Sequence, residues 1–293
     1  MWQLLQIELF KIFRKPRTYI SFGAIAAMVL IIQVALKFDG MSYVEFILGS
    51  LKDTLDIPYA NILNGYFVCF VILNLLLIHI PLLIALVAGD SIAGEANMGT
   101  LRLLVTKPVS RTQLMLAKFS ASVVYTALVL IWMAFLALLL SILLFGTNDI
   151  IIARNDVLEI IKSNDVLWRY IAAFGYATIA LTTVAALAFL LSVFAENSIG
   201  PIVSTISIVI VFTILSEMQI PLYDRTVKPF LFTSHMLAWK GFFYTKVDAG
   251  GSSIPGSIEN LPAVMKSLGI LLGYIVLFVG TAIAVFKRKD ILS

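Results

Sequence analysis

Residues 170–195 read YIAAFGYATIALTTVAALAFLLSVFA, a stretch of 26 residues without a charged side chain. A helix needs about 20 consecutive apolar residues to cross the hydrocarbon core of a bilayer. Five further uncharged stretches long enough for one crossing occur at 18–36, 58–89, 119–148, 197–216 and 267–286. The predicted fold class is therefore an all-α integral membrane protein with six transmembrane helices.

The overall composition supports the same class. Of the 293 residues, 60% are hydrophobic and 13% are charged, whereas a soluble domain carries about 25% charged residues. A water-soluble core is excluded, and we predict one transmembrane domain over residues 1–293. Its membrane-spanning helices are expected at 18–36, 61–89, 113–146, 170–195, 198–217 and 267–286.

The N-terminal segment 1–17 is predicted to be an amphipathic helix that lies in the membrane interface. Its apolar residues recur at helical spacing, and its charged residues fall elsewhere around the helix: Trp2, Leu5, Leu9, Ile12 and Phe13 against Glu8, Lys11, Arg14 and Lys15. Pro16 is expected to end this helix. The alternative is a basic anchor that only sets the topology.

Two features of the first half of the chain have plain explanations. The first apolar stretch is expected to remain as an uncleaved span, because Ala35-Leu36-Lys37 offers no cleavage site of small residues. Cys69 is the only cysteine, so no disulfide forms within the chain, and its place inside span two indicates a packing residue.

The distribution of charge predicts the orientation. Six spans put both termini on one side, which then holds 11 of the 21 basic residues but only 5 of the 17 acidic ones. The basic residues are Lys11, Arg14, Lys15, Arg17, Arg102, Lys107, Arg111, Lys118, Lys287, Arg288 and Lys289. By the positive-inside rule this side is cytoplasmic. Anionic lipid beside these residues explains the basic balance without a nucleic-acid partner.

The connections on the other side differ in character. Residues 37–57 form an outer loop with helical character near 43–51, and the alternating charges of 149–169 indicate a solvated helix. Residues 218–266 carry prolines, glycines and many aromatic side chains, which favours re-entrant or interfacial helices over a small loop. On the inner side, a tight turn at 195–198 makes spans four and five antiparallel neighbours.

Motifs for catalysis are absent from the sequence. It contains no phosphate-binding loop, no His-Glu-x-x-His zinc motif and no Gly-x-Ser-x-Gly nucleophile elbow. No predicted span carries a buried charge that would mark an ion or proton path, and His79 in span two has no carboxylate partner in a span, so a proton relay is disfavoured. We expect neither an enzyme nor a carrier that is driven by its own ion gradient.

The polar interruption at 90–112 is predicted to form a short transverse helix. Span two is expected to end near 94–96, Gly99 to break the chain, and Pro108 to prevent its continuation. Ser110 and Gln113 form a capping-box pattern at the start of span three. Between these breaks lie four apolar residues that need lipid headgroups or a protein groove: Leu101, Leu103, Leu104 and Val105.

The same interruption carries a family resemblance. Gly94-Glu95, Gly99-Thr100-Leu101-Arg102 and Thr106-Lys107-Pro108-Val109-Ser110-Arg111 resemble the hallmark stretch of ABC-2-type transporter permeases. The closest similarity is to permeases of nitrous-oxide-reductase maturation and bacitracin export. The tail Phe286-Lys-Arg-Lys-Asp290 and the whole layout also resemble this family, although the specific motif covers only 94–111.

The resemblance implies a coupling helix that sits in a cleft of a separate ATP-binding cassette subunit. The residues expected to couple to that ATPase are Glu95, Gly99, Thr100, Leu101, Arg102, Leu104, Thr106, Lys107, Pro108, Ser110 and Arg111, with Glu196 and Asn197 of the second cytoplasmic turn. ATP and Mg²⁺ would bind to the partner, and this chain would hold no cofactor or metal of its own.

The expected function is thus that of a permease subunit in a bacterial cytoplasmic membrane. Two copies would pair above two cassette subunits, with an accessory periplasmic or extracellular protein as a further candidate partner. The alternative is an anchor that couples a cytoplasmic ATPase to an extracytoplasmic protein without carrying a solute. An integral-membrane enzyme would need polar residues clustered at one depth. The cargo, its direction and its binding residues are not specified by the sequence.

Overall fold

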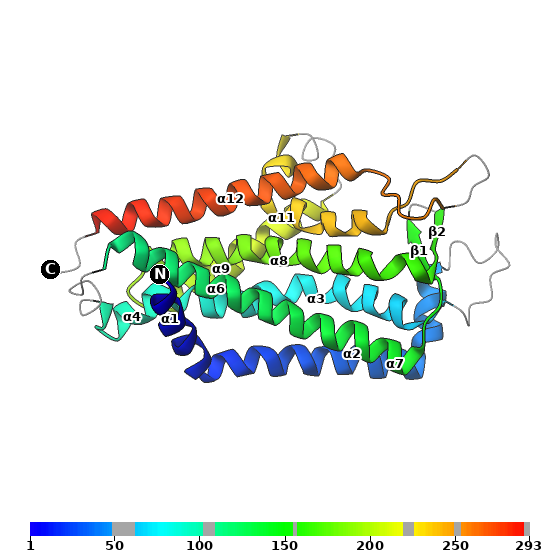
Figure 1. Ribbon diagram of the computed structural model, residues 1–293, viewed down its shortest axis with the longest axis horizontal. Helices are drawn as coiled ribbons and strands as arrows, with labels where there is room; N and C mark the ends of the chain where they lie inside the picture. The colour runs from blue at the N-terminus through cyan, green and yellow to red at the C-terminus, as the bar shows by residue number, and fades with distance from the viewer. Residues whose placement is uncertain (49–61, 102–108, 155–156, 219–225, 249–252, 290–293) are drawn as a thin grey trace.

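The computed structural model describes residues 1–48, 62–101, 109–154, 157–218, 226–248 and 253–289. Within these ranges, six helical rods are long and apolar enough to cross a membrane. They are α2 (Pro16–Leu48), α3 with α4 (Gly65–Ala88, Asp90–Asn97), α6 with η2 and α7 (Arg111–Ala134, Phe135–Leu140, Ser141–Phe145), α8 (Ser163–Phe194), α9 (Ile199–Glu217) and α12 (Leu261–Arg288). The rods run side by side in an elongated bundle (Figure 1).

Helix α8 forms the centre of this bundle. In its most apolar stretch 72% of the residues are buried, against 22% for α9 and 17% for α12. Small residues such as Ala173, Ala177 and Ala180 are fully buried on α8, which lets neighbouring helices approach closely. The outer helices instead expose large apolar side chains, including Ile31, Ile214 and Val276. Such surfaces require lipid, so the structure supports a multi-pass membrane protein.

The two ends of the bundle differ. We call one the basic end, because it carries many Lys and Arg side chains, and the other the hairpin end, because it carries a β-hairpin. At the basic end lie the N-terminal helix α1 (Trp2–Arg14), the end of α4, the α8–α9 turn and the last residues of α12 (Figure 1). At the opposite hairpin end lie β1 (Ile150–Arg154) and β2 (Val157–Ile161). The predicted arrangement of both termini at one end of six spans therefore agrees with the fold.

The hairpin corrects the prediction of a solvated helix at 149–169. Strands β1 and β2 pair antiparallel with Ile150 opposite Ile161, and α8 begins at Ser163. Ile150, Ile152 and Ile161 are buried, whereas Ile160 is 47% exposed. β-Branched residues that alternate between a buried and an exposed face favour strand. The prediction of a helix was based on the alternating charges and did not use this alternation of apolar residues.

Several helices extend beyond their predicted ends. Helix α2 continues to Leu48 across a kink at Asp39, so residues 37–48 are helical where an outer loop was expected. Helix α8 begins seven residues before 170 and α12 six residues before 267. The prediction counted only uncharged residues, but a helix that continues into water tolerates polar and charged ones. Helicity near 43–48 was predicted correctly, and 49–51 lie outside the described ranges.

Short helices fill the connection between α9 and α12. They are η3 (Lys228–Phe230), α11 (Phe232–Met236) and η4 (Leu237–Phe243). Trp239 and Phe243 are fully buried, and Tyr176, well inside α8, donates a hydrogen bond of 2.7 Å to the carbonyl of His235. These elements thus pack along the sides of α8, α9 and α12 (Figure 1). Re-entrant or interfacial helices were predicted at 218–266; the described residues contain short helices, and their place relative to the membrane stays a prediction.

A buried ion pair fastens the hairpin end. Arg169 of α8 is 0% exposed and donates to the Asp165 carboxylate at 2.6 and 3.1 Å. It also donates to the backbone carbonyls of Phe242 at 2.5 Å and Ser257 at 2.9 Å. The amide of Gly256 donates to Asp165 at 3.1 Å. The pair therefore holds Phe242, Gly256 and Ser257 on α8, and it corrects the expectation that these charges are solvated and that no span contains a buried charge.

A close backbone approach joins α3 to α7, and it predicts a substitution effect. A Cβ atom at Gly65 would lie 2.6 Å from Cα of Ile142 and 2.7 Å from the carbonyl oxygen of Ser141. Gly65→Ala should therefore destabilise the protein by about 1–3 kcal/mol through overpacking. The measurement is thermal unfolding of the purified protein. The matched control is Gly175→Ala on α8, where no atom lies within 4 Å of the new methyl group; equal effects of the two variants would contradict the packing argument.

Candidate functional site

The predicted coupling segment leaves the bundle through a well-formed helix end. The rod of α3 and α4 ends at Asn97, and Gly99 adopts φ +68°. The amide of Thr100 donates to the carbonyl of Glu95 at 3.0 Å, and that of Gly99 to Ala96 at 3.0 Å. These two bonds define a Schellman motif, in which glycine is favoured at the left-handed position. The predicted break at Gly99 is confirmed.

The segment re-enters the bundle at a capped helix start. Ser110 is the N-cap of α6, and its hydroxyl accepts a hydrogen bond of 3.2 Å from the amide of Gln113. This bond confirms the cap predicted at Ser110. Between the two ends, five of the predicted coupling residues lie outside the described ranges: Arg102, Leu104, Thr106, Lys107 and Pro108. The predicted transverse helix at their centre stays a prediction.

Leu101, the first apolar residue of the segment, points into the protein itself. It is 6% exposed and belongs to a small apolar core at the basic end. The other members of that core come from four helices: Ile92, Met115, Phe189, Val193, Ala282 and Phe286. Leu101 was expected to need lipid or a partner's groove, but the chain supplies the apolar contact. It therefore anchors the start of the segment.

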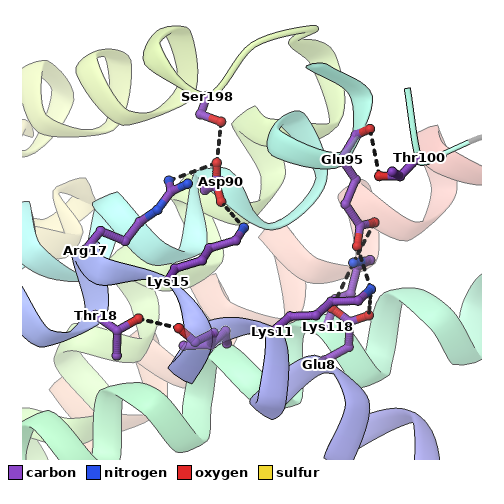
Figure 2. Close-up of polar contacts among 11 residues, drawn as sticks. Glu8, Lys11, Lys15, Arg17, Thr18, Asp90, Glu95, Thr100, Lys118 and Ser198 are labelled. Carbon is purple, nitrogen blue, oxygen red and sulfur yellow. Dashed lines mark hydrogen bonds and ion pairs between the residues drawn. The ribbon is translucent and has the colours of Figure 1, made fainter. Parts of the chain in front are cut away.

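An ion cluster lies directly beside this exit. Lys118 of α6 contacts Glu8 of α1 at 2.9 Å and Glu95 of α4 at 2.7 Å. Lys11 of α1 contacts the same two carboxylates, each at 2.8 Å. Figure 2 shows how the four side chains converge from three helices. Because Glu8, Glu95 and Lys118 are at least 93% buried, the four charges form a closed internal network that joins α1, α4 and α6.

A second group of charges surrounds Asp90, at the joint between α3 and α4. Its carboxylate accepts from Lys15 at 2.5 Å and from Arg17 at 2.9 Å, which flank the junction of α1 and α2. The hydroxyl of Ser198, in the α8–α9 turn, also donates to it (Figure 2). Asp90 is 3% exposed. One carboxylate therefore connects the root of the coupling segment to the N-terminal helices and to the second turn.

Glycine is required opposite this carboxylate. A Cβ atom at Gly94, one turn after Asp90, would lie within 3.0 Å of three atoms of the Asp90 side chain. The absence of a side chain at 94 thus lets the carboxylate lie flat against α4 and reach its three partners. This gives a physical reason for the Gly94-Glu95 pair of the sequence.

Electrostatics keeps Glu8 and Lys11 ionised around neutral pH. Burial alone would raise the pKa of Glu8, but Lys118 and Lys11 more than offset it and hold the pKa below its ordinary value. Burial would lower the pKa of Lys11, but Glu8 and Glu95 raise it above its ordinary value. The stability from Glu8 is lost only in acid, as pH falls through its lowered pKa, and that from Lys11 only in strong base.

The α8–α9 turn, which was predicted to be cytoplasmic, exposes the two residues expected to couple there. Glu196 and Asn197 are both exposed at the basic end, and the Asn197 side chain accepts from the amide of Gly200 at 3.2 Å. The next residue of the same turn, Ser198, belongs to the Asp90 group. The structure thus brings the second turn and the root of the coupling segment together.

Sequence reasoning missed the two charge groups, although one signal was available. Glu8, Lys11, Asp90 and Lys118 served only as markers of topology. Lys118, however, lies four residues after Leu114 and three before Ala121, which are both buried on α6. A lysine on the apolar face of a helix implies a buried partner, because an unpaired buried charge is costly.

The charges of this site are paired with one another. The three buried carboxylates at the basic end, Glu8, Asp90 and Glu95, are each held by cations. In the part of the chain that the structure describes, no three His, Cys, Asp or Glu residues gather so as to hold a metal ion. The paired residues join α1, α4 and α6, which are far apart in the sequence.

Comparisons with known proteins add a family without a known activity. Residues 22–292 match the model of a family described as "Protein of unknown function (DUF2705)". Uncharacterized protein YhcI of Bacillus subtilis (strain 168) is 24% identical over 210 residues, which are 70% of this chain and 63% of that protein. The chain thus matches less than two thirds of the length of this relative. Since the family model extends over nearly the whole sequence, the protein belongs to the DUF2705 family.

Proposed function

We propose that this protein is the transmembrane permease subunit of an ATP-binding cassette transporter. ATP hydrolysis by a separate cassette subunit would drive translocation of a substrate through a pair of these chains. The observation that carries the proposal is the basic end. There, one connection between α4 and α6 is bounded by Gly99 and Ser110, and a buried ion cluster ties its root to α1 and α6. Its sequence also resembles the coupling stretch of ABC-2-type permeases.

The connections at the basic end give a route for the coupling. A push on the segment 98–110 acts first on α4, because the Schellman motif fixes the segment to its end. From Glu95 the force reaches α1 and α6 through Lys11 and Lys118. From Asp90 it reaches the α8–α9 turn through Ser198. In this mechanism the bundle tilts as linked helices, because buried charge pairs resist separation.

The orientation follows from the same proposal. The cassette subunit is cytoplasmic, so the basic end with both termini faces the cytoplasm of a bacterium, and the hairpin end faces outward. Exposed Lys287 and Arg288 at the end of α12 fit an anionic inner leaflet. ATP and Mg²⁺ bind to the partner in this account.

Copurification tests the proposal. The full-length chain is expressed with each candidate cassette ATPase of its source organism and purified in nanodiscs. We expect the two to elute together in equal numbers, with two copies of each, and ATP hydrolysis to exceed that of the cassette subunit alone. Elution of the permease chain without the ATPase, with no change in hydrolysis, would contradict the proposal.

The positive charges predicted to couple to the ATPase should control this stimulation. Arg102→Ala, combined with Lys107→Ala, is expected to reduce the stimulated ATPase rate at least tenfold, since charged contacts at an interface typically contribute about 1.5–3 kcal/mol. The readout is hydrolysis by the reconstituted complex. Lys266→Ala, an exposed lysine near the hairpin end of α12, is the control. Full stimulation in the double variant would remove the coupling role from these two residues.

A second function is favoured by the hairpin end. Arg169 of α8 fixes the carbonyls of Phe242 and Ser257, and the amide of Thr245 donates to the buried carboxylate of Glu159 on β2 at 2.9 Å. Such an ordered surface suits an anchor that couples the ATPase to an extracytoplasmic protein without carrying a solute. An extracellular or periplasmic protein that binds the purified complex through this surface would favour the anchor over the permease.

A further inference from the structure

Arg111, at the far end of the coupling segment, contacts the C-terminal end of α12. It is the first residue of α6, and its Nη1 atom donates to three backbone carbonyls. The distances are 3.3 Å to Phe286, 3.0 Å to Lys287 and 2.9 Å to Lys289. Residues 111 and 289 are thus joined, although 178 positions separate them in the sequence.

The chemistry of a helix end explains why an arginine lies there. The last carbonyls of an α-helix have no partner within the helix, and the macrodipole places partial negative charge on them. Helix α12 ends at Arg288, so the carbonyls of Phe286 and Lys287 are of this kind. A guanidinium group has no acceptor capacity and a fixed charge, so it suits several carbonyls at once.

Two further contacts extend the junction to other helices. Lys289 donates from Nζ to the carbonyl of Val193 at 2.7 Å, near the end of α8. The ring of Phe286 is 1% exposed and shares the small apolar core with Leu101 and Met115. The end of α12 therefore shares an apolar core with Leu101 of the segment and is hydrogen-bonded by Arg111, the first residue after the segment.

We infer that Arg111 is a positioning residue that links the coupling segment to α12, and that it does not serve as a contact for the cassette subunit. The upstream end of the segment acts on α1 and α6 through Glu95, and the downstream end acts on α12 through Arg111. This inference rests on the proposed function for the origin of the push. Through Arg111, α12 has a direct connection to the coupling segment. The ion cluster of Glu8, Lys11, Glu95 and Lys118 contains no residue of α12.

Hydrogen–deuterium exchange of the full chain in nanodiscs tests this link, first without a partner. Arg111→Gln should speed amide exchange in residues 282–289 on the order of tenfold, since the carbonyl ends of α12 lose a charge-assisted bond. Arg111→Lys, which keeps the cation, should restore most of the protection. Arg288→Gln, an exposed arginine on α12 itself, should leave exchange unchanged. Equal exchange in wild type and Arg111→Gln would overturn the inference.

The second arm adds the cassette subunit with a non-hydrolysable ATP analogue. In wild type we expect nucleotide to change exchange both in α4 and in 282–289. In Arg111→Gln the cassette should still bind and α4 should still respond, but the response of 282–289 should disappear and return in Arg111→Lys. Loss of cassette binding in Arg111→Gln would overturn the inference in favour of a docking contact. Failure of the wild-type chain to bind any cassette would instead refute the proposed function, while the first arm still decides the role of Arg111.

Discussion

Lys118→Met is expected to lower the unfolding temperature of the purified protein by on the order of 10 °C. The side chain is 1% exposed and pairs with both Glu8 and Glu95. Its removal leaves two buried carboxylates with only the half-exposed Lys11. Breaking a buried pair typically costs about 3–5 kcal/mol because an uncompensated charge remains, and each kcal/mol shifts the midpoint by about 2–4 °C in a domain of this order of size. The measurement is thermal unfolding in detergent, followed by loss of the monodisperse peak.

Two comparisons make this result specific. Lys287→Met removes an exposed lysine at the same end and should change the midpoint by less than about 2 °C, because surface charges contribute little. Adding Glu8→Gln to Lys118→Met should recover part of the loss, because it removes one of the two unpaired carboxylates. A Lys118→Met protein as stable as Lys287→Met would show that the cluster does not hold α1 and α4 to α6.

Arg169→Leu is expected to open the hairpin end to protease. In the wild type, the carbonyl of Lys246 accepts from Ile254 at 2.8 Å and its amide donates to the Ser257 hydroxyl at 3.0 Å. Ser257 in turn is fixed by Arg169. Without the guanidinium group, Asp165 is left buried and uncompensated, and the loop loses its two carbonyl contacts to α8. We expect trypsin to cleave after Lys246 at least tenfold faster, since local opening governs cleavage.

The control for this experiment lies on the same surface. Lys162 is exposed directly before α8, and Lys162→Leu should leave the rate of cleavage after Lys246 unchanged. Mass spectrometry of the fragments identifies the cut. An Arg169→Leu protein that is cleaved at Lys246 as slowly as wild type would show that other contacts hold the loop, and that the buried pair is not its fastening.

The parts of the fold that could be predicted are those with local signals. The uncharged stretches located all six apolar helices, because the bilayer sets the length of a span. The breaks at Gly99 and Ser110 were also accessible, since a left-handed glycine and an N-cap serine act within one helical turn. The ends of α2, α8 and α12 could not be predicted from the sequence, because a helix does not end where its apolar residues end.

The ion cluster and the Arg111 junction depend on pairs that are distant in the sequence. Lys11 and Glu95 lie 84 positions apart, and Lys118 and Glu8 lie 110 apart. No pattern in one sequence specifies such pairs, although Lys118 on an apolar helix face indicated that a partner exists. Leu101 shows the same limit, because the sequence predicted that it needs an apolar contact and the fold decided that the contact is internal.

Photocrosslinking from the coupling segment tests the central claim most directly. A benzoylphenylalanine is placed at Arg102 or Lys107 in cells that express the chain with the candidate cassette ATPase, and at Ile160 of the hairpin as a control. The account predicts a covalent adduct with the ATPase from positions 102 and 107 and none from 160. Absence of the adduct at both segment positions, or an equal yield from Ile160, would contradict the account.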